Sequence, residues 1–156
     1  MGNLIKKSEL KNKIFFIKAT LENNKKTKSP YRIIEIKGED SLYDLAEMIT
    51  NSFDFDFDHA FGFYNNLSDF GSSDEGYELF ADVGEESTYP GVEKSYIYQV
   101  YTFLKKKFLF YFDYGDDWHF ITELIEINEK VSKKKYPCIC KKIGKAPEQY
   151  PEYDDE

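Results

Sequence analysis

Apolar and polar residues alternate with a period of two near the start of the chain. Within residues 13–22, one side of the pattern is apolar and the other is largely polar: Phe15, Ile17, Ala19 and Leu21 against Phe16, Lys18, Thr20 and Glu22. This alternation is typical of a half-buried strand. Residues 31–37 repeat it and predict a second strand. The lysine-rich stretch 23–30, which is closed by Pro30, predicts a turn or hairpin loop between the two strands.

A helical pattern follows the second strand. Ser41 is a good N-cap residue, and Asp44 lies three positions later, where a carboxylate favours a helix N-terminus. The apolar residues then follow helical spacing: Leu42, Leu45, Ala46, Ile49 and Phe53. Residues 41–52 are therefore predicted to form an amphipathic helix that lies across the sheet.

The middle of the chain gives weaker signals. Residues 54–58 alternate Asp and Phe, which fits either a strand or a loop anchored by two rings, and residues 59–64 predict a third strand. Residues 65–94 are rich in Gly, Ser, Asp and Glu, so we expect a long acidic loop there. Residues 98–104 fit either a short strand or a single helical turn.

The strongest strand signal comes in the second half of the chain. Residues 107–114 carry aromatic side chains on one face and Leu109 and Tyr111 on the other, which predicts a central strand. Turn residues at 115–117 join it to a partner strand at 118–128. Residues 136–156 predict an extended tail, of which residues 145–153 are expected to pack as a strap with Tyr150 and Tyr153 as anchors.

These elements predict one α+β domain over residues 1–156. We expect a largely antiparallel sheet of about five strands, one main helix packed across it and a long acidic loop. Residues 1–12 are expected to form a short charged leader without the apolar core of a signal peptide. A chain of 156 residues suits a single domain.

Composition narrows the class of protein. Aromatic residues make up 18% of the chain, and 29 acidic residues exceed 21 basic ones, of which only Arg32 is an arginine. These counts exclude a disordered chain, a disulfide scaffold, a collagen-like repeat and a membrane span. The acidic balance and scarcity of arginine disfavour a nucleic-acid partner, although the lysine clusters leave a local basic face open. We expect a cytoplasmic protein with reduced thiols and no membrane partner.

The segment FYFDYGDDWHFITEL at residues 110–124 resembles the hallmark hairpin of the plasmid pRiA4b ORF-3-like family. Members of that family are often labelled insertion-element passenger or TnpR-like proteins. Its Y-D-[FY]-G-D-x-W pattern is matched from Phe112 to Trp118, and two further blocks agree at residues 31–63 and 146–151. The positions that match in the first block are Arg32, Ile34, Glu35, Leu42, Leu45, Ile49, Phe53, Asp56, His59 and Phe63.

The resemblance implies an α+β fold with a largely antiparallel sheet and no established reaction. Ala46 stands where the family's helix carries a histidine, and His119 is at best the counterpart of the histidine that usually follows the tryptophan region. The TnpR label, which denotes a resolvase, is disfavoured because serine recombinases need a nucleophilic serine among arginines and this chain has a single arginine.

The hairpin supplies most of the candidate binding residues, which are Asp113, Asp116, Asp117, Trp118, His119 and the more distant Arg32. The carboxylates suit a cation or a basic group of a partner. A structural interpretation is also open, in which Gly115 permits a positive φ, Asp side chains bond the turn amides and Trp118 anchors the hairpin. Arg32 is expected to pair with a buried carboxylate such as Glu35 or Asp113, or to bind an anionic ligand.

A metal site is the alternative, with His59, Asp56, Asp58 and His119 as its nitrogen and oxygen ligands. No catalytic set and no cofactor are indicated, and nothing marks Cys138 or Cys140 as an activated thiolate. The leading hypothesis is an uncharacterised, non-enzymatic binding or accessory domain with a protein partner. The alternatives are a metal-binding protein or metal-dependent hydrolase that uses His59 and nearby Asp residues, and a DNA-binding accessory of a mobile element.

Overall fold

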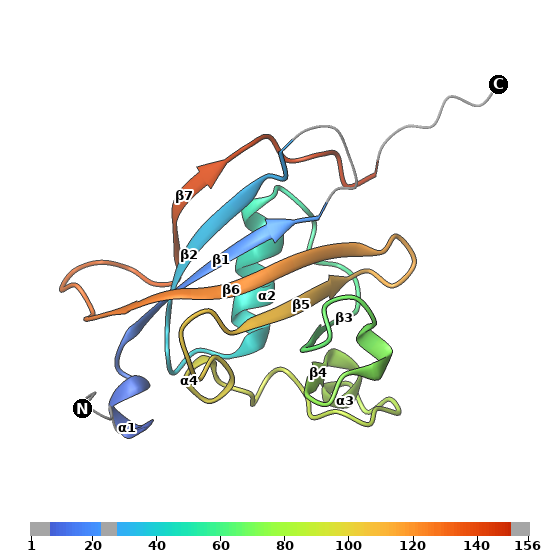
Figure 1. Ribbon diagram of the computed structural model, residues 1–156, viewed down its shortest axis with the longest axis horizontal. Coiled ribbons are helices and arrows are strands. Elements are labelled where there is room, and N and C mark those ends of the chain that lie inside the picture. Colours follow the sequence, from blue (N-terminus) through green and yellow to red (C-terminus); the bar gives the residue numbers. More distant parts are fainter. Residues whose placement is uncertain (1–6, 23–27, 151–156) are drawn as a thin grey trace.

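The computed structural model describes residues 7–22 and 28–150, and its body is one antiparallel sheet with the strand order β4-β3-β5-β6-β1-β2-β7 (Figure 1). The strands are β1 (Ile14–Leu21), β2 (Tyr31–Lys37), β3 (Phe61–Tyr64), β4 (Gly76–Glu78), β5 (Lys107–Phe112), β6 (Trp118–Asn128) and β7 (Cys138–Ile143). The prediction of about five strands was wrong. The two strands that it missed are short edge strands, β4 inside the predicted acidic loop and β7 inside the predicted tail.

The main helix is α2 (Leu42–Ser52), which packs against one face of the sheet (Figure 1). Its predicted start is confirmed, because Asp44 N donates to Ser41 Oγ over 3.2 Å and Ser41 N donates to Asp44 Oδ2 over 3.1 Å. This reciprocal pair forms a capping box. The remaining helices are short: α1 (Lys7–Leu10), the 3-10 turn η1 (Phe70–Ser72), α3 (Leu79–Asp82) and α4 (Ile97–Val100). None of the helices in the described ranges is long and apolar enough to cross a membrane.

The side chains of β5, which is an interior strand of the sheet, point alternately to its two faces, as the sequence pattern predicted. Phe108, Phe110 and Phe112 join the main core beneath α2, whereas Leu109 and Tyr111 join a smaller cluster on the opposite face. Of the 28 aromatic residues, 12 are buried in these two clusters and a further eight pack against them partly buried. Residues that pack on the smaller cluster come largely from the segment expected to be a loop and include Leu67, Phe70 and Tyr89.

The segment 65–94 is ordered rather than a structureless acidic loop. It contains η1, β4 and α3, and the buried Tyr64 fastens it to β3. The Tyr64 hydroxyl donates to the Glu78 carboxylate and lies 2.6 Å from the hydroxyl of Tyr114. Burial and the Glu78 hydrogen bond raise the pKa of Tyr64 well above its ordinary range. The same bonds hold Leu79, the next residue after Glu78, at the start of α3.

Arg32 has a structural role that the sequence did not predict. Its side chain is 4% exposed, and its guanidinium carbon lies 4.3 Å from the centre of the Phe53 ring. Among the described residues, its hydrogen bonds go to backbone carbonyls rather than to Glu35 or Asp113. The acceptors are the carbonyl oxygens of Ser52, Tyr31, Ile143 and Gly144, at 2.8 to 3.1 Å. Arg32 thus joins the end of α2 to the end of β7, where a cation also suits the helix dipole.

We therefore expect Arg32→Met to destabilise the fold. The substitution leaves the buried carbonyl of Ser52 and the part-buried carbonyls of Ile143 and Gly144 without their charged donor, so the free energy of unfolding should fall by about 2–4 kcal/mol. Chemical denaturation followed by circular dichroism measures the change. The control Arg32→Lys keeps the charge and should lose less. A loss below about 0.5 kcal/mol for the methionine variant would contradict this role.

Candidate functional site

His59 lies between the end of α2 and β3, beside the hairpin formed by β5 and β6. Three oxygen atoms surround its Nε2 atom: the hydroxyl of Tyr150 at 2.6 Å, Asp58 Oδ1 at 3.3 Å and Asp113 Oδ2 at 3.4 Å. The edge of the imidazole faces the ring of Phe112, with 6.0 Å between the centroids. Three segments that are distant in the sequence therefore converge on one nitrogen atom.

Asp113 connects the hairpin turn to His59. Its side chain is 8% exposed, and its Oδ1 atom accepts hydrogen bonds from the amides of Gly115 at 3.1 Å and Asp116 at 3.2 Å. The prediction that an Asp side chain bonds the turn amides is confirmed. The prediction that Gly115 supplies the positive φ was wrong, because Asp113 (φ 65°) and Asp117 (φ 56°) adopt it instead. Asp tolerates this left-handed region because its short side chain can bond the nearby backbone.

The other candidate residues of the hairpin do not join Asp113 at His59. Asp116 is exposed, and the Asp117 carboxylate accepts a hydrogen bond from the Tyr111 hydroxyl. His119 pairs with Tyr111 in the strand register, and their rings lie 4.6 Å apart. Alternation along β5 places Tyr111 on the face opposite to Phe112, so His119 and His59 lie on different sides of the hairpin. Trp118 packs on Phe55, with 4.7 Å between ring centroids, and so acts as the predicted anchor.

The metal set that the sequence suggested is not assembled. His119 is separated from His59 by the sheet, and the Asp56 side chain is exposed, so only Asp58 of the predicted partners lies beside His59. Across residues 7–22 and 28–150 there is no group of three or more His, Cys, Asp or Glu side chains that could hold a metal ion.

The C-terminal strap, which we define as residues 146–150, crosses the loop 54–58. Asp56 N donates to Gln149 Oε1 over 2.6 Å, and Gln149 Nε2 donates back to the carbonyl oxygen of Asp56 over 3.1 Å. Tyr150, which is 49% exposed, reaches His59 and Asp58. Partial burial and the Asp58 carboxylate raise the pKa of Tyr150 to about 12, so its hydroxyl is neutral at physiological pH. The predicted Tyr150 anchor is thus present, whereas Tyr153 lies outside the described residues.

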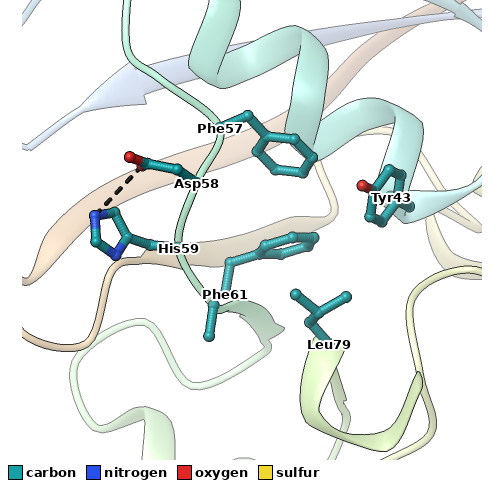
Figure 2. A pocket seen from close by; sticks show the side chains of 7 residues that line it. Tyr43, Phe57, Asp58, His59, Phe61 and Leu79 are labelled. Carbon is teal, nitrogen blue, oxygen red and sulfur yellow. Dashed lines mark ion pairs between the residues drawn. The ribbon is translucent and has the colours of Figure 1, made fainter. Parts of the chain in front are cut away.

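A cleft of about 340 Å³ opens beside His59 (Figure 2). It is lined by Tyr43, Phe57, Asp58, His59, Ala60, Phe61 and Leu79. Figure 2 shows the polar pair Asp58 and His59 on one side and Tyr43 and Leu79 on the other. The Phe57 ring lies 5.2 Å from that of Tyr43 and 5.3 Å from that of Phe61. Rings packed this closely form a continuous aromatic wall, and a guest would lie against them rather than between them.

The loop 54–58 gives this cleft its acidic rim, which consists of the single carboxylate of Asp58. Of the two structures that its alternation allowed, it adopts the loop anchored by rings, with Phe55 buried and Phe57 half-buried. The intervening Asp54, Asp56 and Asp58 are exposed. Sequence reasoning did not assign Tyr43, Phe57, Phe61 or Leu79 to a site, because apolar residues in helices and strands are normally core. The alternation of Asp and Phe was the one available signal.

Comparisons with known proteins agree with the family resemblance. The family model described as plasmid pRiA4b ORF-3-like protein matches residues 13–150. None of the curated proteins matches the sequence. Among solved structures, a protein of unknown function from Methanosarcina mazei Go1 is similar in fold, with a TM-score of 0.68 and 17% sequence identity over 83% of this chain and 69% of that chain.

The geometry of Asp113 predicts different effects for two substitutions. Asp113→Asn keeps a side chain that tolerates the positive φ and still accepts from the turn amides, so it should cost less than about 1 kcal/mol of unfolding free energy. Asp113→Ala loses both amide bonds at a strained φ and should cost about 2–3 kcal/mol. Thermal and chemical denaturation of the two variants test this. Equal losses would show that the turn bonds do not stabilise the hairpin.

Proposed function

Since the chain belongs to the plasmid pRiA4b ORF-3-like family, whose name states no reaction, we propose that it is a non-enzymatic binding module for a protein partner. The cleft beside His59 receives a segment of that partner that is both basic and apolar. The observation that carries this proposal is the combination of an aromatic wall and an acidic rim in one cleft. A partner segment with one lysine or arginine next to an apolar side chain would contact both.

The wall supports the apolar part of the proposal. Tyr43, Phe57 and Leu79 are only half-buried, so their side chains keep surface that an incoming apolar group can cover. Aromatic residues are enriched in the buried centres of protein interfaces, where they give large contact area at low entropic cost. The buried Phe61 supports the wall from behind. The wall is therefore formed before a partner arrives.

The rim supports the basic part. The Asp58 side chain is 52% exposed at the mouth of the cleft, whereas the exposed Asp54 and Asp56 of the same loop do not line it. A lysine or arginine that reached Asp58 would form a charge-assisted hydrogen bond. The overall charge of −8 would also favour the approach of a basic partner.

The surroundings of His59 favour binding over catalysis. A general base needs a nitrogen directed at the substrate, within hydrogen-bond reach of the proton that it removes. The Nε2 atom of His59 faces Tyr150, Asp58 and Asp113, all within 3.4 Å, so this nitrogen is engaged within the protein and only Nδ1 is left for a substrate proton. In this proposal the imidazole fixes the positions of the Asp58 carboxylate and the Tyr150 hydroxyl at the rim.

A displayed library of random peptides tests the proposal. Selection on the purified protein should enrich peptides that carry a lysine or arginine beside an apolar residue. Synthetic versions of these peptides should bind Asp58→Asn and Leu79→Ala at least about tenfold more weakly than the unaltered protein. The matched control is Asp74→Asn, which removes the same charge from an exposed loop position that does not line the cleft.

The outcome that would contradict the proposal is also specific. Enrichment of acidic peptides, or of peptides whose affinity changes equally in Asp58→Asn and Asp74→Asn, would mean that the cleft does not select a basic segment. Circular dichroism of each variant confirms that the fold is kept before affinities are compared.

A further inference from the structure

The segment 130–147 has a charge opposite to that of the rest of the chain. It contains seven lysines and no acidic residue, while the remaining 14 basic residues face all 29 acidic ones. The lysines are Lys130, Lys133, Lys134, Lys135, Lys141, Lys142 and Lys145. This segment comprises the connection that follows β6 and the whole of β7. We call it the basic arm.

The basic arm contains an edge of the sheet. β7 is the last strand in the sheet order and, within the described part of the chain, pairs only with β2 (Figure 1). Cys140, Lys141, Lys142 and Ile143 are all exposed. An exposed edge strand presents a row of backbone N–H and C=O groups on its outer side, which can pair with another strand. The opposite edge, β4, is only three residues long.

Lysines flank both faces of this edge. In the register with β2, Lys141 lies opposite Ile33 and Lys142 lies opposite Arg32. Because neighbouring side chains of a strand point to opposite faces, these two lysines lie on opposite sides of the sheet. A strand added beside β7 would therefore meet a lysine on each of its own faces.

We propose that the β7 edge binds an extended acidic segment of a partner protein, which adds to the sheet as an eighth strand. Backbone hydrogen bonds to β7 would provide affinity, as in other cases of strand addition. Cross-strand pairs between Glu or Asp of the partner and Lys141 or Lys142 would provide selectivity. This surface is separate from the cleft beside His59 and opposite to it in charge, so the proposal does not depend on the function proposed for that cleft.

The charge of the arm argues against two other occupants. A second copy of this chain paired through β7 would bring Lys141 and Lys142 of both copies close together, and like charges across strands are destabilising. A nucleic acid would offer phosphate oxygens, which only accept hydrogen bonds and leave the carbonyl groups of the edge unmatched. The arm also lacks arginine, the residue best suited to bidentate phosphate contacts.

A synthetic Thr-Glu peptide that repeats Thr-Thr-Glu-Glu is the first probe, because it combines strand propensity with carboxylates on both faces of a strand. Its binding to the full chain at low ionic strength, measured by fluorescence anisotropy, should saturate with a Kd below about 1 mM. A Gly-Glu peptide that repeats Gly-Gly-Glu-Glu has the charge without the strand propensity, and a Thr-Lys peptide that repeats Thr-Thr-Lys-Lys has the propensity with the wrong charge. Both should bind at least about tenfold more weakly.

Charge reversal then locates the site. Combining Lys141→Glu with Lys142→Glu should weaken the Thr-Glu peptide at least about tenfold. The matched control, Lys94→Glu with Lys107→Glu, makes the same change in net charge at exposed positions outside the arm and should alter affinity less than about threefold. Backbone amides of β7 should exchange hydrogen more slowly with the peptide bound, because the added strand pairs with them.

Several results would overturn the proposal. These are a failure of the Thr-Glu peptide to saturate below about 1 mM, equal affinity for the Gly-Glu peptide, and equal losses of affinity in the two double variants. Slowed hydrogen exchange only at amides outside β7 would overturn it as well. Tighter binding of single-stranded DNA than of the Thr-Glu peptide would assign the arm to nucleic acid instead. Concentration-dependent dimers that the lysine reversals abolish would assign it to a second copy.

Discussion

The contact between the Asp113 carboxylate and the His59 imidazole is the constraint on which the rest of the site depends. One oxygen of Asp113 holds the amides of the hairpin turn, and the other faces His59 at 3.4 Å. His59 in turn faces Tyr150 of the C-terminal strap. Buried carboxylates are retained only where hydrogen bonds and charges compensate them, so this chain of contacts fixes the hairpin, the acidic loop and the strap together. The cleft and its acidic rim lie directly beside it.

The helices and strands whose apolar residues recur with a regular period could be predicted from the sequence. The capped helix at 41–52 and the hairpin strands β5 and β6 carry long, unbroken patterns, and each lies close to where the pattern placed it. The edge strands were missed for a physical reason. β4 has three residues, and β7 (CICKKI) lacks a buried face, so neither leaves an alternating signal. The order in 65–94 was missed because it comes from single anchors such as Tyr64 and Glu78 rather than from a periodic pattern.

The candidate site was predicted in part. Asp113 and His59 were both identified as residues of interest, but a sequence does not show which side of a hairpin each side chain takes, so His119 was grouped with His59. Arg32 was expected to pair with a carboxylate, since that is the usual partner of a buried arginine. It binds the carbonyls at the ends of α2 and β7, whose meeting depends on the strand order. The convergence of Tyr150 on His59 joins positions 91 residues apart and left no local pattern.

We propose that the cleft beside His59 receives a basic and apolar segment of a partner protein. To test this binding, a photoreactive amino acid is placed at position 79 and activated in host cells, and the crosslinked peptide is identified by mass spectrometry. The control carries the same amino acid at position 126 on β6. We expect one crosslinked protein whose attachment point lies within a few residues of a lysine or arginine. This crosslink should be absent from the control and reduced in Asp58→Asn. Crosslinks to nucleic acid, to acidic segments or equally from both positions would contradict it.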